Sequence, residues 1–457
     1  MTETTQNSSS LAQKFTQLQN ATKTTQNTIP KIQKVPHYLR GREHFAKHYS
    51  PKLVAIGPIH RNDSNLELGQ KYKLIWAAMY LERTNQDAKN LFQKILSNIG
   101  RLKELFADDV IEKLTDEELS WMLFVDGCSL LQILDKGKPH ASQEINVKID
   151  QLVLVLHDIL LLENQLPFDV LKLLSTHGDD DTLLIRSMNN FLECNHHLSP
   201  RRPEIGQGTT KDEDRELAED GGYVSVYIKN EDTLRGEHIK CPFHLLDQLR
   251  RHVLDDTDQS KTNNQNTNED CMTTYRNITE LRAVGIKLKS TESRSRRYIS
   301  FSYRWMCLCA ELMLPEILVD DTTATTYLNL IAYETCPDFE NKFEICSFVA
   351  FMDSLIDHPE DVKELRKAKV LRNALGSDEE VAQLFNTISA DLMPNPEIYS
   401  KVRCQIEKHY RNRWRTWIAL GYQSHFSNPW AIIAFLGAIV ALILTFIQTW
   451  LAINPVD

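Results

Sequence analysis

The chain has 457 residues, of which 42% are apolar and 25% are charged, and this composition is that of an ordinary folded protein. With 62 acidic and 52 basic residues the net charge is −10, which disfavours a broadly basic nucleic-acid-binding protein. Nine cysteines are too few for a disulfide scaffold and fit a reducing compartment, while a mean hydropathy of −0.37 excludes a multi-span transporter.

Residues 1–28 form a polar N-terminal segment rich in Thr, Gln, Asn and Ser, and this composition predicts disorder. The segment has no apolar stretch of the length that a secretory signal needs. From Ile29 the chain becomes more apolar and carries prolines at Pro30, Pro36, Pro51 and Pro58. Because proline removes a backbone donor and disfavours helix, we expect an ordered arm of extended segments and turns, wrapped on the main body.

Helical patterns dominate the next part of the chain. Apolar residues recur at helical spacing from Leu66 to about Leu105. Thr115 and Glu118 form a capping box ahead of an apolar run that reads WMLFVDGCSLLQIL. This pair therefore predicts the start of a further helix, in which Asp126 is a structural residue.

A second apolar run extends from Leu152 to Leu162, where only His157 and Asp158 are polar. Eleven residues are too few to cross a bilayer as a helix. We therefore expect a buried core helix that ends or kinks at Pro167.

The polar residues in and after this run are the strongest chemical candidates in the sequence. A buried charge is costly unless it is paired or hydrogen-bonded. One interpretation makes Glu163 a pocket residue with a shifted pKa. The alternative is structural, and we favour it because the sequence names no partner nucleophile or base. In that case residues 163–165 satisfy backbone groups freed by Pro167, or Glu163 pairs with an arginine such as Arg40.

Residues 199–279 differ in composition and predict a disordered or looped insert. The stretch 211–220 carries six acidic and two basic residues, and the stretch 255–270 has no apolar residue. Between these stretches, residues 238–253 predict a short helix docked on the body.

Short alternating runs between residues 281 and 319 predict a small β-meander. Three arginines, at positions 294, 296 and 297, interrupt it and could bind phosphate groups. We interpret them as a solvated hairpin tip, since Glu292 lies beside them.

Helices return from Thr325, and Ser377 and Glu380 form a second capping box. A last long helix is expected from about Asn395 to Gly421. Basic residues near its end alternate with aromatic ones, which predicts either a juxtamembrane segment at lipid headgroups or ordinary helix packing. The basic residues in question are Lys408, Arg411, Arg413 and Arg415.

An apolar C-terminal segment from Trp430 to Leu451 contains 22 residues, about 33 Å as a helix, and no Asp, Glu, Lys or Arg. This predicts a transmembrane helix at residues 428–451, followed by a short tail at 452–457. Positions along the expected span are Trp430, Gly437, Leu444 and Trp450. Because the basic residues precede the span, the positive-inside rule predicts a tail-anchored, single-pass protein whose bulk is cytosolic.

A series of motifs occurs in a fixed order along the chain. The series begins with IxKVPxxLR, YxPxxVxIGPxH, DGCSLLQIL and DILLLENQLPFDVL, which lie between Ile32 and Leu171. It continues with LRAVGIKLK, LPEILVDDTT, MDSLID and LGSDEEVAQLFN, and ends with the Pro-Trp pair at Pro429. From about Ile29 to its end the chain resembles the plant DUF247 family, also called UPF0481. Ala55 and Ile59 stand where the family usually has Ser and Tyr.

The resemblance implies a plant protein, usually with one C-terminal span, and a family without an established biochemical activity. Some grass members of the family are linked to pollen-side self-incompatibility recognition. The resemblance therefore implies a class of protein and names no reaction.

A search for catalytic and metal-binding motifs predicts no catalytic residue, no cofactor and no metal. His44 and His48 have the i, i+4 spacing of a metal pair, but Arg42 and Lys47 would repel a cation. Cys307 and Cys309 lack the second close pair that a zinc site needs, so we expect buried thiols there.

The sequence thus predicts a mainly α-helical protein, α+β with a small β-meander, built as one large domain at 29–427 with a C-terminal transmembrane helix. We expect a non-enzymatic interaction, recognition or signalling component at a membrane, with the lipid bilayer and a protein partner as contacts and no nucleic acid. One alternative is a membrane-associated enzyme with a pocket near Glu163. Another is a peripheral module that binds lipid headgroups.

Overall fold

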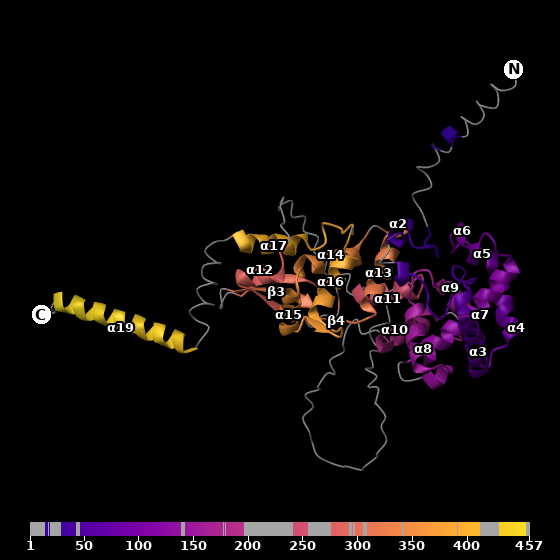
Figure 1. The fold of residues 1–457 in the computed structure, drawn as a ribbon, viewed down its shortest axis with the longest axis horizontal. Helices are drawn as coiled ribbons and strands as arrows, with labels where there is room; N and C mark the ends of the chain where they lie inside the picture. Colours follow the sequence, from indigo (N-terminus) through magenta and orange to yellow (C-terminus); the bar gives the residue numbers. More distant parts are fainter. Residues whose placement is uncertain are drawn as a thin grey trace, which may run out of the picture.

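The protein is described by a computed structural model (Figure 1). It describes residues 14–16, 18, 29–42, 46–138, 142–176, 178, 180–195, 241–254, 276–291, 295, 298–304, 309–340, 342–390, 392–411 and 429–453. The predicted acidic insert stretches, the three arginines at 294–297, and His44, Cys307, Arg413 and Arg415 lie outside these residues. The prediction of disorder for 1–28 stays a prediction, and the four residues described there are helical.

The first half of the body is helical (indigo to magenta in Figure 1). Its elements, in chain order, are α2 (His37–Arg40), η1 (Ala46–His48), η2 (Ser64–Leu66), α3 (Glu67–Thr84), α4 (Ala88–Ser97), α5 (Ile99–Lys103), α6 (Asp108–Ile111), α7 (Asp116–Lys136), η3 (Ser142–Ile145), α8 (Ile149–Asp158), α9 (Phe168–Leu174) and α10 (Asp181–Asn195).

Helix α7 is the centre of this half. The predicted capping box is present: the Thr115 hydroxyl accepts the Glu118 N–H at 3.2 Å, and Glu118 Oε2 accepts the Thr115 N–H at 3.0 Å. From Leu123 to Leu134 every side chain is buried, because α3, α4 and α9 pack around the helix. A helix that is buried on all sides is largely apolar all round, and its buried polar residues, such as Asp126 and Ser129, need partners.

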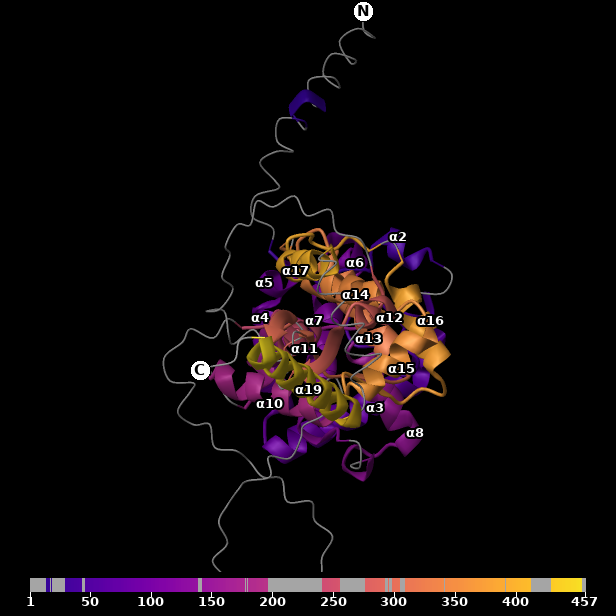
Figure 2. The ribbon, with the colours of Figure 1, turned by 90° about the vertical axis from the view of Figure 1, so that its left-hand side faces the viewer.

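The second half contains α11 (Leu245–Leu254), α12 (Ile278–Ala283), β1 (Ile286–Thr291), β2 (Ser300–Arg304), β3 (Cys309–Pro315), β4 (Ile317–Val319), α13 (Thr323–Glu334), α14 (Glu344–Leu355), α15 (Pro359–Lys367), β5 (Leu371–Asn373), α16 (Asp378–Ile388) and α17 (Ser400–Arg411). Helices α15 and α16 lie side by side in both views (Figures 1 and 2). One apolar core runs without interruption through both halves.

The predicted β-element exists, but it is not a meander. Strand β3 lies between the other two strands of its sheet, parallel to β1 and antiparallel to β2. A meander requires β1 and β2 to pair directly. A second, two-stranded sheet joins β4 to β5 in parallel, across more than fifty residues of chain. Periodicity along one strand carries no information about such distant partners.

The predicted core helix of the second apolar run is shorter than expected. Helix α8 ends at Asp158, nine residues before Pro167, and the chain continues as a buried turn. Asp158 is the last residue of the helix, and its carboxylate binds backbone groups of the N-terminal arm, as described below.

The helix expected at the C-terminus forms as α19 (Pro429–Ile453), but the prediction of a transmembrane helix is wrong. Across the residues that the structure describes, no helix is both long and apolar enough to span a membrane.

Candidate functional site around Glu163

The turn between α8 and α9 carries the polar residues that the sequence singled out. Asp158, Glu163, Asn164 and Gln165 are all at most 1% exposed. Facing them is the N-terminal arm that starts at Ile29, and its residues 49–60 belong to no helix or strand. An extended, buried arm must find partners for its backbone N–H groups, because unpaired buried amides are costly.

Asp158 supplies three of these partners. Its Oδ1 accepts the Lys52 N–H at 2.9 Å, and its Oδ2 accepts the N–H groups of Leu53 and Val54 at 2.7 and 2.9 Å. Burial raises the pKa of the Asp158 carboxyl, and the three amide hydrogen bonds act against that shift.

Asn164 and Gln165 continue the same pattern. Asn164 Oδ1 accepts the Ile56 N–H at 2.6 Å, while its amide donates to the carbonyls of Val54 and Asp158, both at 2.9 Å. The Gln165 amide donates to two carbonyls of the turn, those of Ile159 and Leu161, at 2.8 Å each. The backbone groups bound by Asn164 and Gln165 thus lie in the arm and in the turn after α8, whereas the sequence predicted groups freed by Pro167.

Asp126, on α7, holds the next residue of the arm. Its Oδ2 accepts the Gly57 N–H at 2.8 Å, and its Oδ1 lies 2.6 Å from Lys73 Nζ on α3. Both charged side chains are buried, at 1% and 3% exposure. Burial raises the pKa of the Asp126 carboxyl, while the Lys73 ammonium and the Gly57 amide lower it in part.

Glu163 is held by three groups of the arm. Its Oε1 accepts the Val35 N–H at 2.8 Å, and its Oε2 forms an ion pair with the guanidinium of Arg40, the arginine expected from the sequence. His60 Nε2 lies 2.9 Å from the same Oε2, although its N–H is not directed at that oxygen. Both carboxylate oxygens are thus bound by groups of the arm.

His48 and His157, also near the arm, are part-buried. Burial lowers the pKa of each to about 4, and the nearby lysine Lys52 contributes to both shifts. His48 Nδ1 lies 2.6 Å from the hydroxyl of Thr325. Among the residues that the structure describes, no group of three or more His, Cys, Asp or Glu side chains could hold a metal ion.

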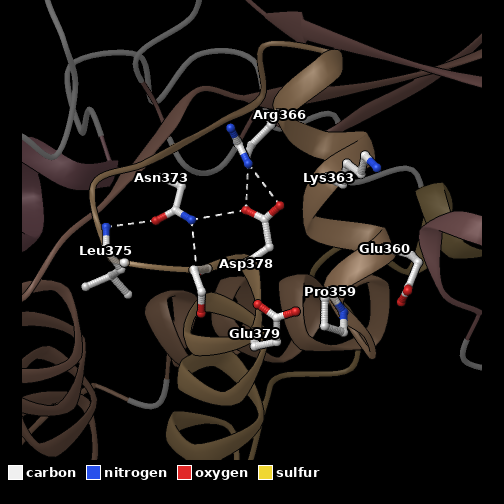
Figure 3. Close-up of a pocket in the computed structure, with 10 residues that line it drawn as sticks. Pro359, Glu360, Lys363, Arg366, Asn373, Leu375, Asp378 and Glu379 are labelled. Atoms are coloured by element: carbon white, nitrogen blue, oxygen red, sulfur yellow. Dashed lines mark hydrogen bonds and ion pairs between the residues drawn. The ribbon is translucent and has the colours of Figure 1, made fainter.

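A surface pocket of about 520 Å³ lies elsewhere, where α15, β5 and the start of α16 meet (Figure 3). Among its lining residues, Asp378 accepts hydrogen bonds from two neighbours. Arg366 Nη1 lies 2.9 Å from each oxygen of the Asp378 carboxylate, and the Asn373 amide donates to Oδ1 at 3.1 Å. Lys363, Glu360 and Glu379 also line the pocket. The charges are mixed, and they converge on no single point, so the pocket indicates no particular ligand.

The residues predicted for the juxtamembrane segment are only partly placed. Lys408 and Arg411 lie on α17, where both are exposed, and Arg411 Nε donates to Glu407 at 2.8 Å. Gly437, Leu444 and Trp450 are exposed on α19, and Trp430 belongs to the same helix. The structure brings neither group together with the Glu163 cluster.

Two members of the buried cluster were not found from the sequence. Lys73 lies in an amphipathic run of α3, and nothing in its surroundings distinguishes it from an exposed lysine. Asn329 on α13 accepts the Leu162 N–H at 2.8 Å and donates to the His48 carbonyl at 2.9 Å. Its partners are 167 and 281 residues away, so no local signal exists.

Fold and site together define a class: a mainly helical α+β protein whose N-terminal arm is fixed by buried polar side chains. Residues 32–444 match the DUF247 family, described as plant proteins of unknown function, and the chain belongs to that family. The resemblance seen in the ordered motifs is thereby confirmed.

Two curated relatives come from Arabidopsis thaliana. The UPF0481 protein At3g47200 is 25% identical over 432 residues, covering 89% of this chain and 83% of that protein. The putative UPF0481 protein At3g02645 is 23% identical over 465 residues, covering 88% and 86%. No solved structure matches the chain.

Proposed function

We propose that this plant protein acts by binding other proteins, as a recognition or signalling component, and not by catalysis. The observation that carries the proposal is the engagement of Glu163. The residue with the strongest claim to chemistry has both oxygens bound by groups of its own chain. A catalytic carboxylate must instead reach its substrate.

Exposed apolar side chains in the first half of the body support protein binding as the function. Helix α3 exposes three large apolar side chains within about two turns: Leu68, Leu74 and Ile75. Apolar side chains grouped on one helix favour protein contact, because burying them releases water from their surface.

The experiment is affinity purification of the full chain from plant tissue, followed by reconstitution with each purified candidate partner. We expect a stoichiometric complex whose Kd rises at least about tenfold in Leu74→Lys, as expected for a buried interface side chain. Lys363→Ala, an exposed change on α15 in the second half, is the control and should leave the Kd unchanged. Conversion of a small molecule by the purified chain, lost in a point variant that remains folded, would refute the proposal.

A further inference from the structure

The Trp121 face is an exposed aromatic surface at the N-terminal end of α7. Trp121 is 53% exposed, although it packs against Phe92 of α4 at 6.0 Å and Phe124 at 5.7 Å between ring centroids. A tryptophan in this position leaves a large apolar area in water.

The surroundings of this face are acidic. Residues 104–118 contain seven acidic residues and one lysine, Lys113, and lysines outside the stretch pair with three of the acids: Asp108, Asp109 and Asp116. Asp116, Glu117 and Glu118 make up the first turn of α7, and Glu117 lies one turn from Trp121 on the same side of the helix. A partner for this face therefore needs apolar side chains together with positive charge.

Open space lies on the neighbouring helix α5. It packs on α7, and Lys103 Nζ lies 2.8 Å from Asp116 Oδ1. Gly100 of α5 is exposed, and a Cβ built on it would meet nothing within 4 Å. The glycine is thus not required by packing within the body, although glycine in a helix costs up to about 1 kcal/mol relative to alanine.

The N-terminal segment leaves the body beside this face. The Ile32 N–H donates to the Leu105 carbonyl at 2.8 Å, and the Ile32 carbonyl accepts the Ala107 N–H at 2.9 Å. The arm is therefore fixed at the junction of α5 and α6, immediately before α7. From Ile29 back to Leu18 the chain can extend to roughly 36–40 Å, which is ample to reach Trp121.

The N-terminal segment also has the required chemistry. Leu11, Phe15 and Leu18 have the i, i+4, i+7 spacing of one helix face. Phe15 and Leu18 lie in helical backbone and are 59% and 70% exposed. Residues 1–28 carry two lysines, at 14 and 23, and one glutamate, so their side chains are net positive.

We propose that residues 11–18 dock as an amphipathic helix on the Trp121 face of the same chain. Phe15 and its apolar neighbours cover the indole, and Lys14 lies toward the acidic first turn of α7. Attachment makes a weak contact sufficient: at an effective concentration of about 1 mM, a contact with a Kd of about 0.1 mM is occupied about nine-tenths of the time. This inference does not depend on the proposed function.

The test places the photo-crosslinking residue p-benzoylphenylalanine at position 15 of the full-length chain. After irradiation, crosslinked peptides are identified by mass spectrometry. We expect crosslinks to peptides that contain Phe92 or Trp121, with a yield at least about fivefold above the same label at Gln17, on the opposite helix face. Crosslinks no more frequent than at Gln17 would overturn the proposal.

Two variants and one mixing experiment complete the test. Trp121→Ala should lower the yield about tenfold if the indole is the anchor. The double change Leu11→Asp with Leu18→Asp should do the same, and it cannot disturb the fold of the body. An unchanged yield in the second variant refutes docking. In a mixture of isotopically heavy and light chains, crosslinks should join residues of one chain, and heavy–light crosslinks would instead indicate docking on a second copy.

Discussion

Asp158 shows how one side chain can replace a strand partner. Its two oxygens accept three consecutive backbone amides of the arm, which a neighbouring β-strand could not do for residues in this irregular conformation. Asn164 and Asp126 serve the two amides at Ile56 and Gly57 in the same way. The polar residues of the DILLLENQLPF motif therefore have a structural explanation at the level of single hydrogen bonds.

Removing the Asp158 carboxylate should leave three amides without an acceptor. Each unsatisfied buried donor costs about 1–3 kcal/mol, so Asp158→Ala should lower the free energy of unfolding by about 3 kcal/mol or more. Urea unfolding measures this directly. Asp169→Ala removes an exposed ion pair with Arg101 and should cost less than about 1 kcal/mol. Equal losses in the two variants would show that Asp158 does not hold the arm.

His244 predicts a dependence of stability on pH. It is 1% exposed, and burial lowers its pKa to about 4, with Asp247 acting against the shift and Arg251 reinforcing it. Between pH 6.5 and 4 the unfolded chain takes up a proton that the folded chain excludes. The free energy of unfolding therefore falls as the pH is lowered through this range, by at most about 3 kcal/mol from His244, and this contribution is intact above pH 6.5.

The variant His244→Asn isolates this effect. The His244 ring accepts the Asp247 N–H at 3.0 Å, and an asparagine oxygen can replace that acceptor without titrating. Urea unfolding at pH 7 and pH 5 should show a smaller difference for the variant than for the natural chain. His48 and His157 titrate in the same direction and remain in both proteins, so the difference is reduced and not abolished. An unchanged difference would mean that His244 is protonated in the folded state.

Helix α7 illustrates what the local sequence controls at the scale of an element. Its start was predictable because a capping box is a contact between residues three apart. The end of α8 was not predictable, because Asp158 is recruited by an arm more than a hundred residues earlier in the chain. The prediction of strand order failed because β3 lies between β1 and β2, a pairing that the pattern within each strand does not specify.

The cap of α7 gives a prediction at this scale. Thr115→Ala removes the acceptor for the Glu118 amide, and the loss of such a cap costs about 1 kcal/mol. Thermal or urea unfolding should detect this loss. Thr84→Ala, at the last residue of α3, serves as a control. It removes a hydroxyl that donates to the Tyr80 carbonyl, and we expect little effect on stability. A loss at Thr115 no larger than at Thr84 would show that the capping box does not stabilise α7.

At the scale of the molecule the arm joins the two halves. Lys34 pairs with Asp109 in the first half, while the Lys31 amide donates to Asp338 and Arg42 donates to the Ala390 carbonyl in the second. Removing the arm would therefore expose both halves of one continuous core. We expect the body to unfold as a single unit, because its halves share these contacts and that core.

The sequence predicted the helical class, the arm, both cap positions and the pairing of Glu163 with Arg40. It did not predict the partners of Asp126 and Asn329, or the parallel pairing of β1 with β3. The C-terminal prediction failed at the level of the span, although the helix itself forms. Capping contacts join residues three apart and leave a pattern in the sequence, whereas the partners of Asp126 and Asn329 and the β1–β3 pairing are set by the packed fold.

Hydrogen–deuterium exchange of residues 52–57 tests the central claim, that buried polar side chains hold the arm. These residues belong to no helix or strand, so a loose arm would exchange at the rate of an unprotected chain. Because side chains bind the amides of Lys52, Leu53, Val54, Ile56 and Gly57, we predict protection of at least about a thousandfold, close to that of α7. Exchange of these amides at the unprotected rate in the natural chain would contradict the account.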